Sequence, residues 1–466
     1  MRRYKTAVVP GLLPDDRFSS AKLTRWKKIS GKGRVFVVAC ARFYSVNSVI
    51  PHYSIMAQSK ILVGLEIGSS KTCVVVGEVR PDATATIIGV GAVRSAGVRK
   101  GEVTNLPLAL QCVCDAWQFA QDEAEVDILN VFLSVTGEHI YGENNVGSYR
   151  LPDDENIIED AHLDLTREKA VTLELAADRF VINRELGGYS IDGRTPESNV
   201  VGLAGRTLDV NCHIMHGIRD RLQNSLLCVR KVPLEVEDIV FAPLATAQVV
   251  LTRQQKEAGA LLIDIGGGTT DFICYHRGDV VASGCIPAGG KLINQDIVTL
   301  TSQRVSAEAA EALKCTEGNA FGDVKDRSLA QYRSELGMHD GTIARGELNR
   351  IIRDRLAEIL VRVKRRLPED VWRQSGMCVY LSGGTSLMRG LDELAHYIFQ
   401  VPVYPYHVMQ QAMAAQTGRK HTYLADPRYC TAIGLIRYAQ RYDDDALHGS
   451  GGNFFKRLLS LFMRGK

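Results

Sequence analysis

The strongest hydrophobic pattern in the chain occurs twice, once in each half. Residues 61–76 read ILVGLEIGSSKTCVVV, and residues 260–274 read ALLIDIGGGTTDFIC. Each segment contains an apolar run, an acidic residue followed by Ile-Gly, a turn of small residues and a second apolar run. Short apolar runs on either side of such a turn predict a β-hairpin. The repeat therefore predicts two related halves.

The two segments align without a gap. The alignment pairs Glu66 with Asp264, Gly68 with Gly266, Ser69 with Gly267 and Thr72 with Thr270. Small residues leave the backbone N–H groups of a turn open to phosphate oxygens, and a carboxylate at the strand end can hold a hydrated Mg²⁺ beside them. One such hairpin alone is more often a plain tight turn, but two matching ones favour a shared nucleotide site. The predicted phosphate contacts are Gly68, Ser69, Ser70, Lys71, Gly266, Gly267, Gly268, Thr269 and Thr270, and the predicted Mg²⁺ contacts, through water, are Glu66 and Asp264.

A third glycine-rich turn lies near the C-terminus. Residues 378–387 read CVYLSGGTSL, which predicts a strand that runs into a turn containing Gly383, Gly384 and Thr385. A helical pattern over residues 391–399 follows. A turn of this kind that opens a helix can place an adenosine or its α-phosphate against backbone N–H groups.

In this order, the three loops resemble the phosphate-1, phosphate-2 and adenosine motifs of the actin superfamily. From about residue 62 onward, the chain resembles the FtsA family of bacterial cell-division proteins. Matching stretches include KGEVTN at 100–105, LSVTGEHI at 133–140, NVVGLAGRTLD at 199–209 and PRYCTAIGLIRY at 427–438. The resemblance implies an α/β, actin-like (ribonuclease H-like) two-lobed fold with an FtsA-type α+β inserted subdomain. It also implies ATP and Mg²⁺ as cofactors.

The resemblance also implies a division of the chain. Subdomain 1A comprises residues 61–136, 214–254 and 425–442, and the inserted subdomain 1C comprises 137–213. Subdomain 2A comprises 255–290 and 376–424, and subdomain 2B comprises 291–375. Within the insert, the pattern predicts a helix over 164–178 and strands at 180–182 and 207–214. Residues 1–60 are expected to be an N-terminal extension that is disordered or mis-started, with residues 1–55 lying before a true start at Met56.

By the same resemblance, further adenosine and ribose contacts fall on Gly289, Gly290 and Asn294. Glu311 and Lys314, on a helix predicted over 307–315, would meet the ribose and base. The alternative for these two residues is a solvated i,i+3 ion pair on a helix.

Two positions depart from the superfamily pattern. Glu66 stands where the superfamily usually has Asp, so its carboxylate is one methylene further out. Within the predicted helix 241–250, Ala242 stands where related ATPases have a polar residue that orients the attacking water. No catalytic residue is therefore assigned, and we expect ATP binding with weak or no hydrolysis.

Composition narrows the functional classes. The chain has 466 residues, a net charge of +3 and 11 cysteines. The first 55 residues hold 11 of the Lys and Arg side chains and only two acidic ones, so the remainder is mildly acidic and unlike a nucleic-acid-binding protein. Scattered cysteines without a metal-site spacing favour a reducing compartment.

The last residues form a second strong pattern. Residues 454–464 read FFKRLLSLFMR. On a helix, Lys456 and Arg457 lie opposite an apolar face, which is formed by Phe454, Phe455, Leu458, Leu459, Leu461 and Phe462. Eleven residues reach only about 17 Å, so this helix would lie in a bilayer interface. The alternative, a terminal helix docked on its own domain, is disfavoured by the polar linker at 443–453. Residues 454–466 are therefore predicted to be an amphipathic membrane-targeting helix.

A basic amphipathic helix is predicted over residues 346–368. A core-packed helix with solvated charges is the simpler interpretation. In the FtsA family this region receives the C-terminal tail of the tubulin-like protein FtsZ, and Arg355 matches a family arginine implicated in that contact. Self-association into actin-like filaments, anionic membrane lipids and later divisome proteins are the other implied partners.

Three hypotheses follow. The first is a peripheral protein on the cytoplasmic face of the inner membrane at the division septum, which polymerises there and tethers FtsZ filaments. The second is a pilus-assembly ATP-binding protein of the PilM type, for which the C-terminal anchor is not expected. The third is an enzyme of the superfamily, such as a sugar kinase or heat-shock ATPase, against which Ala242 and the anchor both weigh.

Overall fold

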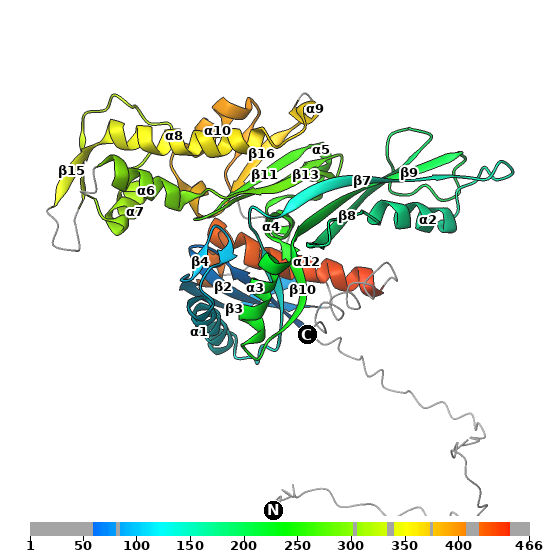
Figure 1. Ribbon diagram of the computed structural model, residues 1–466, viewed down its shortest axis with the longest axis horizontal. Coiled ribbons are helices and arrows are strands. Elements are labelled where there is room, and N and C mark those ends of the chain that lie inside the picture. Colours follow the sequence, from blue (N-terminus) through cyan, green and yellow to red (C-terminus); the bar gives the residue numbers. More distant parts are fainter. Residues whose placement is uncertain are drawn as a thin grey trace, which may run out of the picture. The chain divides into compact units, whose positions relative to one another are not determined.

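Figure 1 shows a computed structural model of the chain, which describes residues 59–80, 84–301, 305–332, 340–372, 376–406 and 419–447. These residues belong to one unit, Met56–Lys466. Two large β-sheets organise it, one of five strands and one of eight. We call the five-stranded sheet and its helices lobe I. Lobe II is the half of the eight-stranded sheet that carries the second predicted hairpin, with its helices.

The first predicted hairpin lies inside the sheet of lobe I, whose strand order is β10-β6-β1-β2-β3. β6 runs parallel to both β1 and β10, so their C-terminal ends meet at one edge. At this edge, Glu66 of β1 lies beside Ser134 of β6. The bounds are β1 Lys60–Ile67, β2 Lys71–Val79, β3 Ala85–Arg94, β6 Asn130–Val135 and β10 Glu235–Phe241.

Two helices cover this sheet, α1 (Leu106–Ala124) against β2 and β3, and α12 (Cys430–Leu447) against β1 and β2. α1 begins at Asn105, whose side chain accepts a hydrogen bond from the backbone N–H of Leu108. A glycine on β3 allows α1 to lie close to the sheet, because a Cβ on Gly91 would lie 1.8 Å from the carbonyl oxygen of Ala116. In Figure 1 the two helices lie on opposite sides of the sheet.

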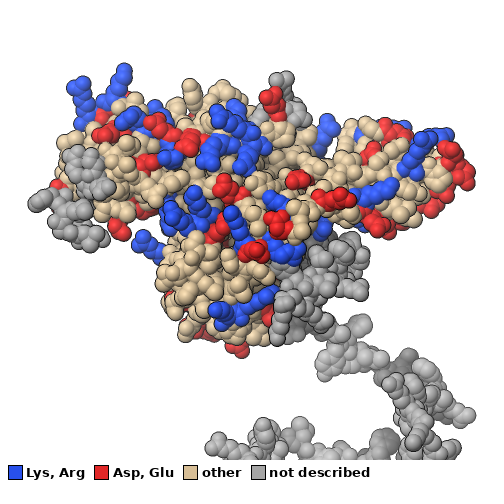
Figure 2. Space-filling model, in the orientation of Figure 1, with Lys and Arg blue, Asp and Glu red and all other residues tan. Residues whose placement is uncertain are grey.

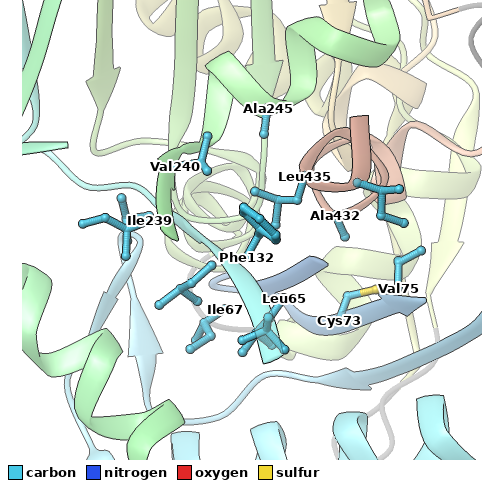
Figure 3. Close-up of a cluster of buried hydrophobic side chains, with 14 of the residues drawn as sticks. Leu65, Ile67, Cys73, Val75, Phe132, Ile239, Val240, Ala245, Ala432 and Leu435 are labelled. Atoms are coloured by element: carbon cyan, nitrogen blue, oxygen red, sulfur yellow. The ribbon is translucent and has the colours of Figure 1, made fainter. Parts of the chain in front are cut away.

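The core of lobe I lies on both faces of the sheet. Figure 3 shows Phe132 beside Leu435 of α12, near Ala432, whereas Leu65 points to the opposite face of the sheet. All four residues are at least 95 % buried. Each fully buried large side chain contributes roughly 1.5–3 kcal/mol relative to exposure, so this packing fixes the strand ends that carry the turns. α12 also crosses α4 (Ala242–Val250), which begins directly after β10.

The second predicted hairpin lies in the eight-stranded sheet, whose order is β17-β16-β11-β12-β13-β7-β9-β8. β16 is parallel to β11 in the same way that β6 is parallel to β1. The internal repeat therefore extends beyond the hairpins to the neighbouring strand. The bounds are β11 Ala260–Ile265, β12 Thr270–His276, β13 Asp279–Ile286, β16 Cys378–Ser382 and β17 Val403–Tyr404.

The other strands of this sheet form the inserted subdomain, to the right in Figure 1, and α2 packs on them. They are β7 Tyr141–Arg150, β8 Arg179–Ile191 and β9 Thr207–Ile218. The seam with lobe II is one paired position, Gly284 of β13 with Tyr141 of β7. Side chains strengthen it: Asn144 donates to the carbonyl oxygen of Val281 at 2.9 Å, and His213 lies 2.7 Å from the hydroxyl of Ser283.

Two predictions within the insert are wrong in their bounds. The helix predicted over 164–178 is α2, Asp160–Val171. It begins earlier because Glu159 and His162 form a capping box, and beyond Val171 the amide of Asn145 on β7 donates to the carbonyl of Thr172. The strand predicted at 180–182 is the first part of the much longer β8, which gains its length by pairing with β9.

The predicted helices of lobe II are confirmed to within a few residues. The adenosine-loop helix is α10, Leu391–Phe399, and the helix predicted over 307–315 is α7, Ala307–Thr316. The basic helix is α8, Arg345–Lys364, and it packs against α6, Gly290–Leu300. No helix in the described ranges is long and apolar enough to cross a membrane. The remaining elements are α3 Arg219–Arg230, α5 Arg253–Ala258, α9 Glu369–Trp372, α11 Arg419–Ala425, η1 Gly384–Leu387, η2 Pro427–Tyr429, β4 Val98–Arg99, β5 Glu102–Val103, β14 Leu329–Tyr332 and β15 Gly341–Ala344.

Candidate functional site

The two hairpins have the same register and the same turn. Ile67 pairs with Thr72, and Ile265 pairs with Thr270. In each turn the N–H of the glycine after the isoleucine donates to a carbonyl three residues on, Gly68 to Lys71 at 3.0 Å and Gly266 to Thr269 at 2.9 Å. The predicted repeat is therefore present in three dimensions, one copy in each lobe.

Both turns line one cleft between the lobes, with a volume of about 620 Å³. The third turn joins them, because the hydroxyl of Thr385 donates to the carbonyl oxygen of Gly266 at 3.2 Å. Gly383 has a φ of +83°, and a Cβ there would lie 2.3 Å from a carboxylate oxygen of Asp264. Predicted contacts in the lining are Glu66, Gly68, Ser69, Ser70, Lys71, Asp264, Gly266, Gly267, Gly268, Thr269, Gly290, Glu311, Lys314, Gly383, Gly384 and Thr385.

Three predicted contacts are not among the lining residues. Thr270 is buried, and its hydroxyl donates to the carbonyl oxygen of Ala288 at 2.9 Å. Gly289 precedes α6 and packs against the backbone of Gly267. Asn294 donates from its amide to Glu311 at 2.5 Å. These three residues contact the backbone or side chains around the cleft and do not line it themselves.

Carboxylates gather at the end of the second hairpin. Asp264 pairs across the hairpin with Asp271, which is 6 % exposed and also lines the cleft. Burial, with repulsion from Asp271 and Glu66, raises the pKa of Asp264 to about 7. Burial likewise raises the pKa of Asp271 to about 6, against a hydrogen bond from Thr136. A cation bound between these carboxylates would reduce the repulsion between their negative charges.

This donor set fits Mg²⁺, which prefers carboxylate oxygens and binds through one or two of them together with water and substrate phosphates. Within the described ranges, no group of three or more His, Cys, Asp or Glu side chains could hold a metal by itself. An ion here would complete its coordination with water and with phosphate oxygens, so these carboxylates suit an ion that arrives with a nucleotide.

Cationic side chains lie opposite. Lys71 contacts Glu66 at 2.8 Å and stands over the ring of Tyr429. Burial acts to lower the pKa of Lys71, but attraction to Cys73 and Glu66 outweighs it and raises the pKa above its ordinary value. Lys314 contacts Glu311 at 2.6 Å. The pKa of Glu311 is lowered, because hydrogen bonds from Lys314 and Asn294 outweigh the effect of burial.

Ala242 also lines the cleft, at the start of α4. One turn along the same helix, Thr246 donates to the carboxylate of Asp264 at 3.1 Å. The position expected to orient water thus carries only a methyl group, and the nearest hydroxyl on this helix is bonded to a carboxylate.

Sequence reasoning missed several cleft residues, among them Thr136, Asp271, Lys291 and Tyr429. Asp271 could have been found, since counting back across the predicted turn places it opposite Asp264. Thr136 and Lys291 carry no local signal, because their partners are far away in the sequence.

Arg355 lies on α8, outside the cleft. Its guanidinium contacts the carboxylate of Asp296 on α6 at 2.6 and 2.9 Å, and it also contacts Glu358. The hydrogen bonds to Asp296 raise the pKa of Arg355. Figure 2 shows Lys and Arg side chains along the upper edge, where α8 runs in Figure 1, interspersed with acidic ones. The predicted membrane helix 454–466 lies outside the described residues.

Matched hairpins around one cleft, with an inserted subdomain, define an actin-like two-lobed protein. A solved PilM–PilN type IV pilus biogenesis complex has this fold in a chain with a TM-score of 0.56 and 18 % identity, covering 80 % of this chain and 97 % of that one. Family models match twice: cell division protein FtsA over residues 261–434, and the SHS2 domain inserted in FtsA over residues 137–216.

Curated relatives agree with these models. Cell division protein FtsA of Neisseria meningitidis serogroup B is 33 % identical over 390 residues, which cover 82 % of this chain and 91 % of the relative. The protein of the same name in Escherichia coli K12 is 31 % identical over 418 residues, or 86 % and 97 % of the two chains. The chain belongs to the FtsA family of cell-division proteins.

Proposed function

We propose that this protein binds ATP with Mg²⁺ in the cleft between its lobes and works as a membrane-attached filament that tethers FtsZ polymers at the division septum. The observation that supports ATP binding most strongly is the pair of glycine-lined turns with equal register facing one cleft. Their backbone N–H groups and Lys71 suit the phosphates. Glu311 and Lys314 suit the ribose, and the turn at Gly383 suits the adenosine.

We also propose that ATP is a structural switch, hydrolysed slowly or not at all. Phosphoryl transfer to water needs a group that orients the attacking water, and its loss typically slows the reaction by orders of magnitude. Ala242 provides no such group. The expected turnover is below that of Ala242→Gln, in which the side chain could reach a water in the cleft. A steady-state phosphate-release assay on both proteins tests this.

The membrane part of the proposal rests on the pattern of residues 454–466 and on family membership. One short amphipathic helix gives only marginal, reversible binding, as one myristoyl chain does with about 10⁴ M⁻¹. Stable attachment therefore needs several copies, which a filament supplies by avidity. Membrane binding and polymerisation are coupled on this argument, on the cytoplasmic face of the inner membrane. Recruitment of later divisome proteins would follow from the same placement.

The decisive experiment is co-sedimentation of FtsZ with this protein on anionic vesicles, with and without ATP. We expect FtsZ in the pellet only when protein and ATP are both present. Deletion of residues 454–466 should remove the protein and FtsZ from the pellet and leave ATP binding unchanged. FtsZ recruitment by the truncated protein, or recruitment that is equal without ATP, would contradict the proposal.

The FtsZ-tail site is proposed at Arg355, where a tail carboxylate would have to displace Asp296. This makes two opposite expectations for a tail-peptide titration. Arg355→Gln should weaken binding, and Asp296→Asn should strengthen it by leaving the guanidinium with one carboxylate fewer. Arg365→Gln, an exposed position just after α8, is the matched control. Unchanged affinity in both Arg355→Gln and Asp296→Asn would remove Arg355 from the site.

A further inference from the structure

Lys291 is the second residue of α6 and spans the two phosphate loops. Its backbone N–H donates to the carbonyl oxygen of Gly267 at 2.8 Å, next to a similar bond from Gly290 to Gly266 at 3.0 Å. Its side chain crosses the cleft, and the ammonium donates to the carbonyl oxygen of Ser69 at 2.5 Å. One residue is thereby fixed to the turn of lobe II and hydrogen-bonded to the turn of lobe I.

The acceptor is held just as firmly. Ser69 is 7 % exposed, and its hydroxyl accepts a hydrogen bond from the backbone N–H of Gly101 at 2.9 Å. The two turns touch here, since a Cβ on Gly268 would lie 2.4 Å from the hydroxyl oxygen of Ser69. Because both ends of the Lys291 contact are anchored, the contact ties one turn to the other.

The chemistry of the Lys291 ammonium favours a phosphate as a second acceptor. Burial lowers the pKa of Lys291, and Arg94 lowers it further, while Glu311 acts in the opposite direction. A carbonyl oxygen carries only a partial charge, whereas a phosphate oxygen forms a charge-assisted hydrogen bond of about twice the strength. The Lys291 ammonium lies in the cleft lining, where it can donate to both acceptors at once.

We propose that Lys291 is the positioning residue that closes the cleft: it bridges the two phosphate loops and, when a nucleotide is bound, ties its phosphates to Ser69 and slows their release. The second half rests on the proposed function, and the first half does not. Lys291 is an exposed residue, so its substitution leaves the buried cores intact.

The first test uses the full chain without nucleotide. Hydrogen exchange is compared between the wild type, Lys291→Met and Lys291→Arg, in peptides covering residues 66–72 and 99–103. Loss of one hydrogen bond to a charged donor should speed exchange of these peptides about tenfold in Lys291→Met. Lys291→Arg keeps the cation and should stay close to the wild type. Equal exchange in the wild type and Lys291→Met would overturn the bridge.

Lys169 supplies the matched control. Its ammonium also donates to a backbone carbonyl, that of Ser148 at 2.9 Å, but within the inserted subdomain. Lys169→Met should change neither loop peptide. If Lys169→Met accelerated exchange of the loops as much as Lys291→Met, the effect would be general destabilisation and the proposal would fail.

The second test measures dissociation of a fluorescent ATP analogue by stopped flow. Lys291→Met should release it about tenfold faster, and adenosine, which has no phosphate, should bind the variant and wild type equally. A rate unchanged by the substitution would overturn the role in nucleotide release. If the wild type bound no analogue, the proposed ATP function would fail, and the exchange experiment on the empty protein would still decide the bridge.

Discussion

The two phosphate loops share a backbone but differ in how their carboxylates are balanced. In the first hairpin, Glu66 is neutralised by Lys71 of its own turn, and the residue across the hairpin is Cys73. In the second, Asp264 receives hydrogen bonds from Thr246 and Thr431 and faces a second acid, Asp271. The first loop is thus self-compensating in charge, whereas the second has an excess of negative charge.

This difference assigns separate tasks to the two copies of one motif. The first loop supplies its own cation and suits direct contact with phosphate oxygens. In the second loop, burial and repulsion from neighbouring carboxylates raise the pKa of both acids, and so this loop suits a divalent cation that arrives with the nucleotide.

Asp264→Asn should cause the largest loss, about a hundredfold in affinity for Mg²⁺-ATP, because it removes the acid at the centre of the uncompensated cluster. Glu66→Gln should lose about tenfold or less. The measurement is a fluorescent-nucleotide titration with Mg²⁺ and with EDTA. The division of tasks predicts that the loss in Asp264→Asn disappears in EDTA; equal losses for both variants would show that the two loops do not differ in this way.

Lys71→Met should weaken ATP binding about tenfold, through the loss of one charge-assisted contact to phosphate. In contrast to Asp264→Asn, this loss should be the same with and without Mg²⁺. Isothermal titration with ATP and adenosine checks it, since adenosine lacks the phosphates and should bind unchanged. A loss that vanished in EDTA would place the metal at the first loop instead.

The Glu66–Lys71 pair should show a coupling of about 1 kcal/mol in the nucleotide-free protein, as expected for a close ion pair that is only 20 % exposed on each side. Glu66→Gln and Lys71→Met would each destabilise the fold, and the double variant would lose less than their sum. Urea unfolding of the four proteins gives the coupling energy. Additive losses would show that the first loop is not self-compensating.

Asp264→Asn should slightly stabilise the empty protein, by about 0.5 kcal/mol, because it removes repulsion between buried acids while keeping hydrogen-bonding capacity. The effect is small because two threonine hydroxyls already stabilise the carboxylate. Thermal unfolding in EDTA measures it, and Glu66→Gln should move the midpoint in the opposite direction. A lower midpoint for Asp264→Asn would contradict an excess of negative charge.

Local signals in the sequence were sufficient for much of the fold. The hairpins were predictable because two apolar runs and a four-residue turn lie within sixteen residues, and α10 because its apolar spacing begins directly after Gly390. The insert was harder. The ends of α2 depend on a capping box at Glu159 and on Asn145 of a neighbouring strand, and neither interrupts the apolar spacing from which the helix was predicted.

The residues of the candidate site also differ in whether a local sequence signal could predict them. Residues inside the repeated turns were predictable, since their role follows from the turn itself. Thr136 meets Asp271 across 135 positions of sequence, and Lys291 meets Ser69 across 222. Contacts of this kind are created by packing of the two lobes and leave no periodicity to detect. Arg355 was assigned from resemblance alone, and the resemblance could not show that its guanidinium already donates two hydrogen bonds to the carboxylate of Asp296.

The seam at Gly284 and Tyr141 makes the inserted subdomain a lateral extension of lobe II, although its sequence interrupts lobe I. The insert is also bonded to lobe I, because the backbone N–H of Phe241 on β10 donates to the amide oxygen of Asn183 on β8 at 2.8 Å. Phe180, Ile182 and Met215 of the insert strands belong to the core of lobe I. Any rotation of one lobe against the other would therefore have to deform the insert or break its contacts on one side.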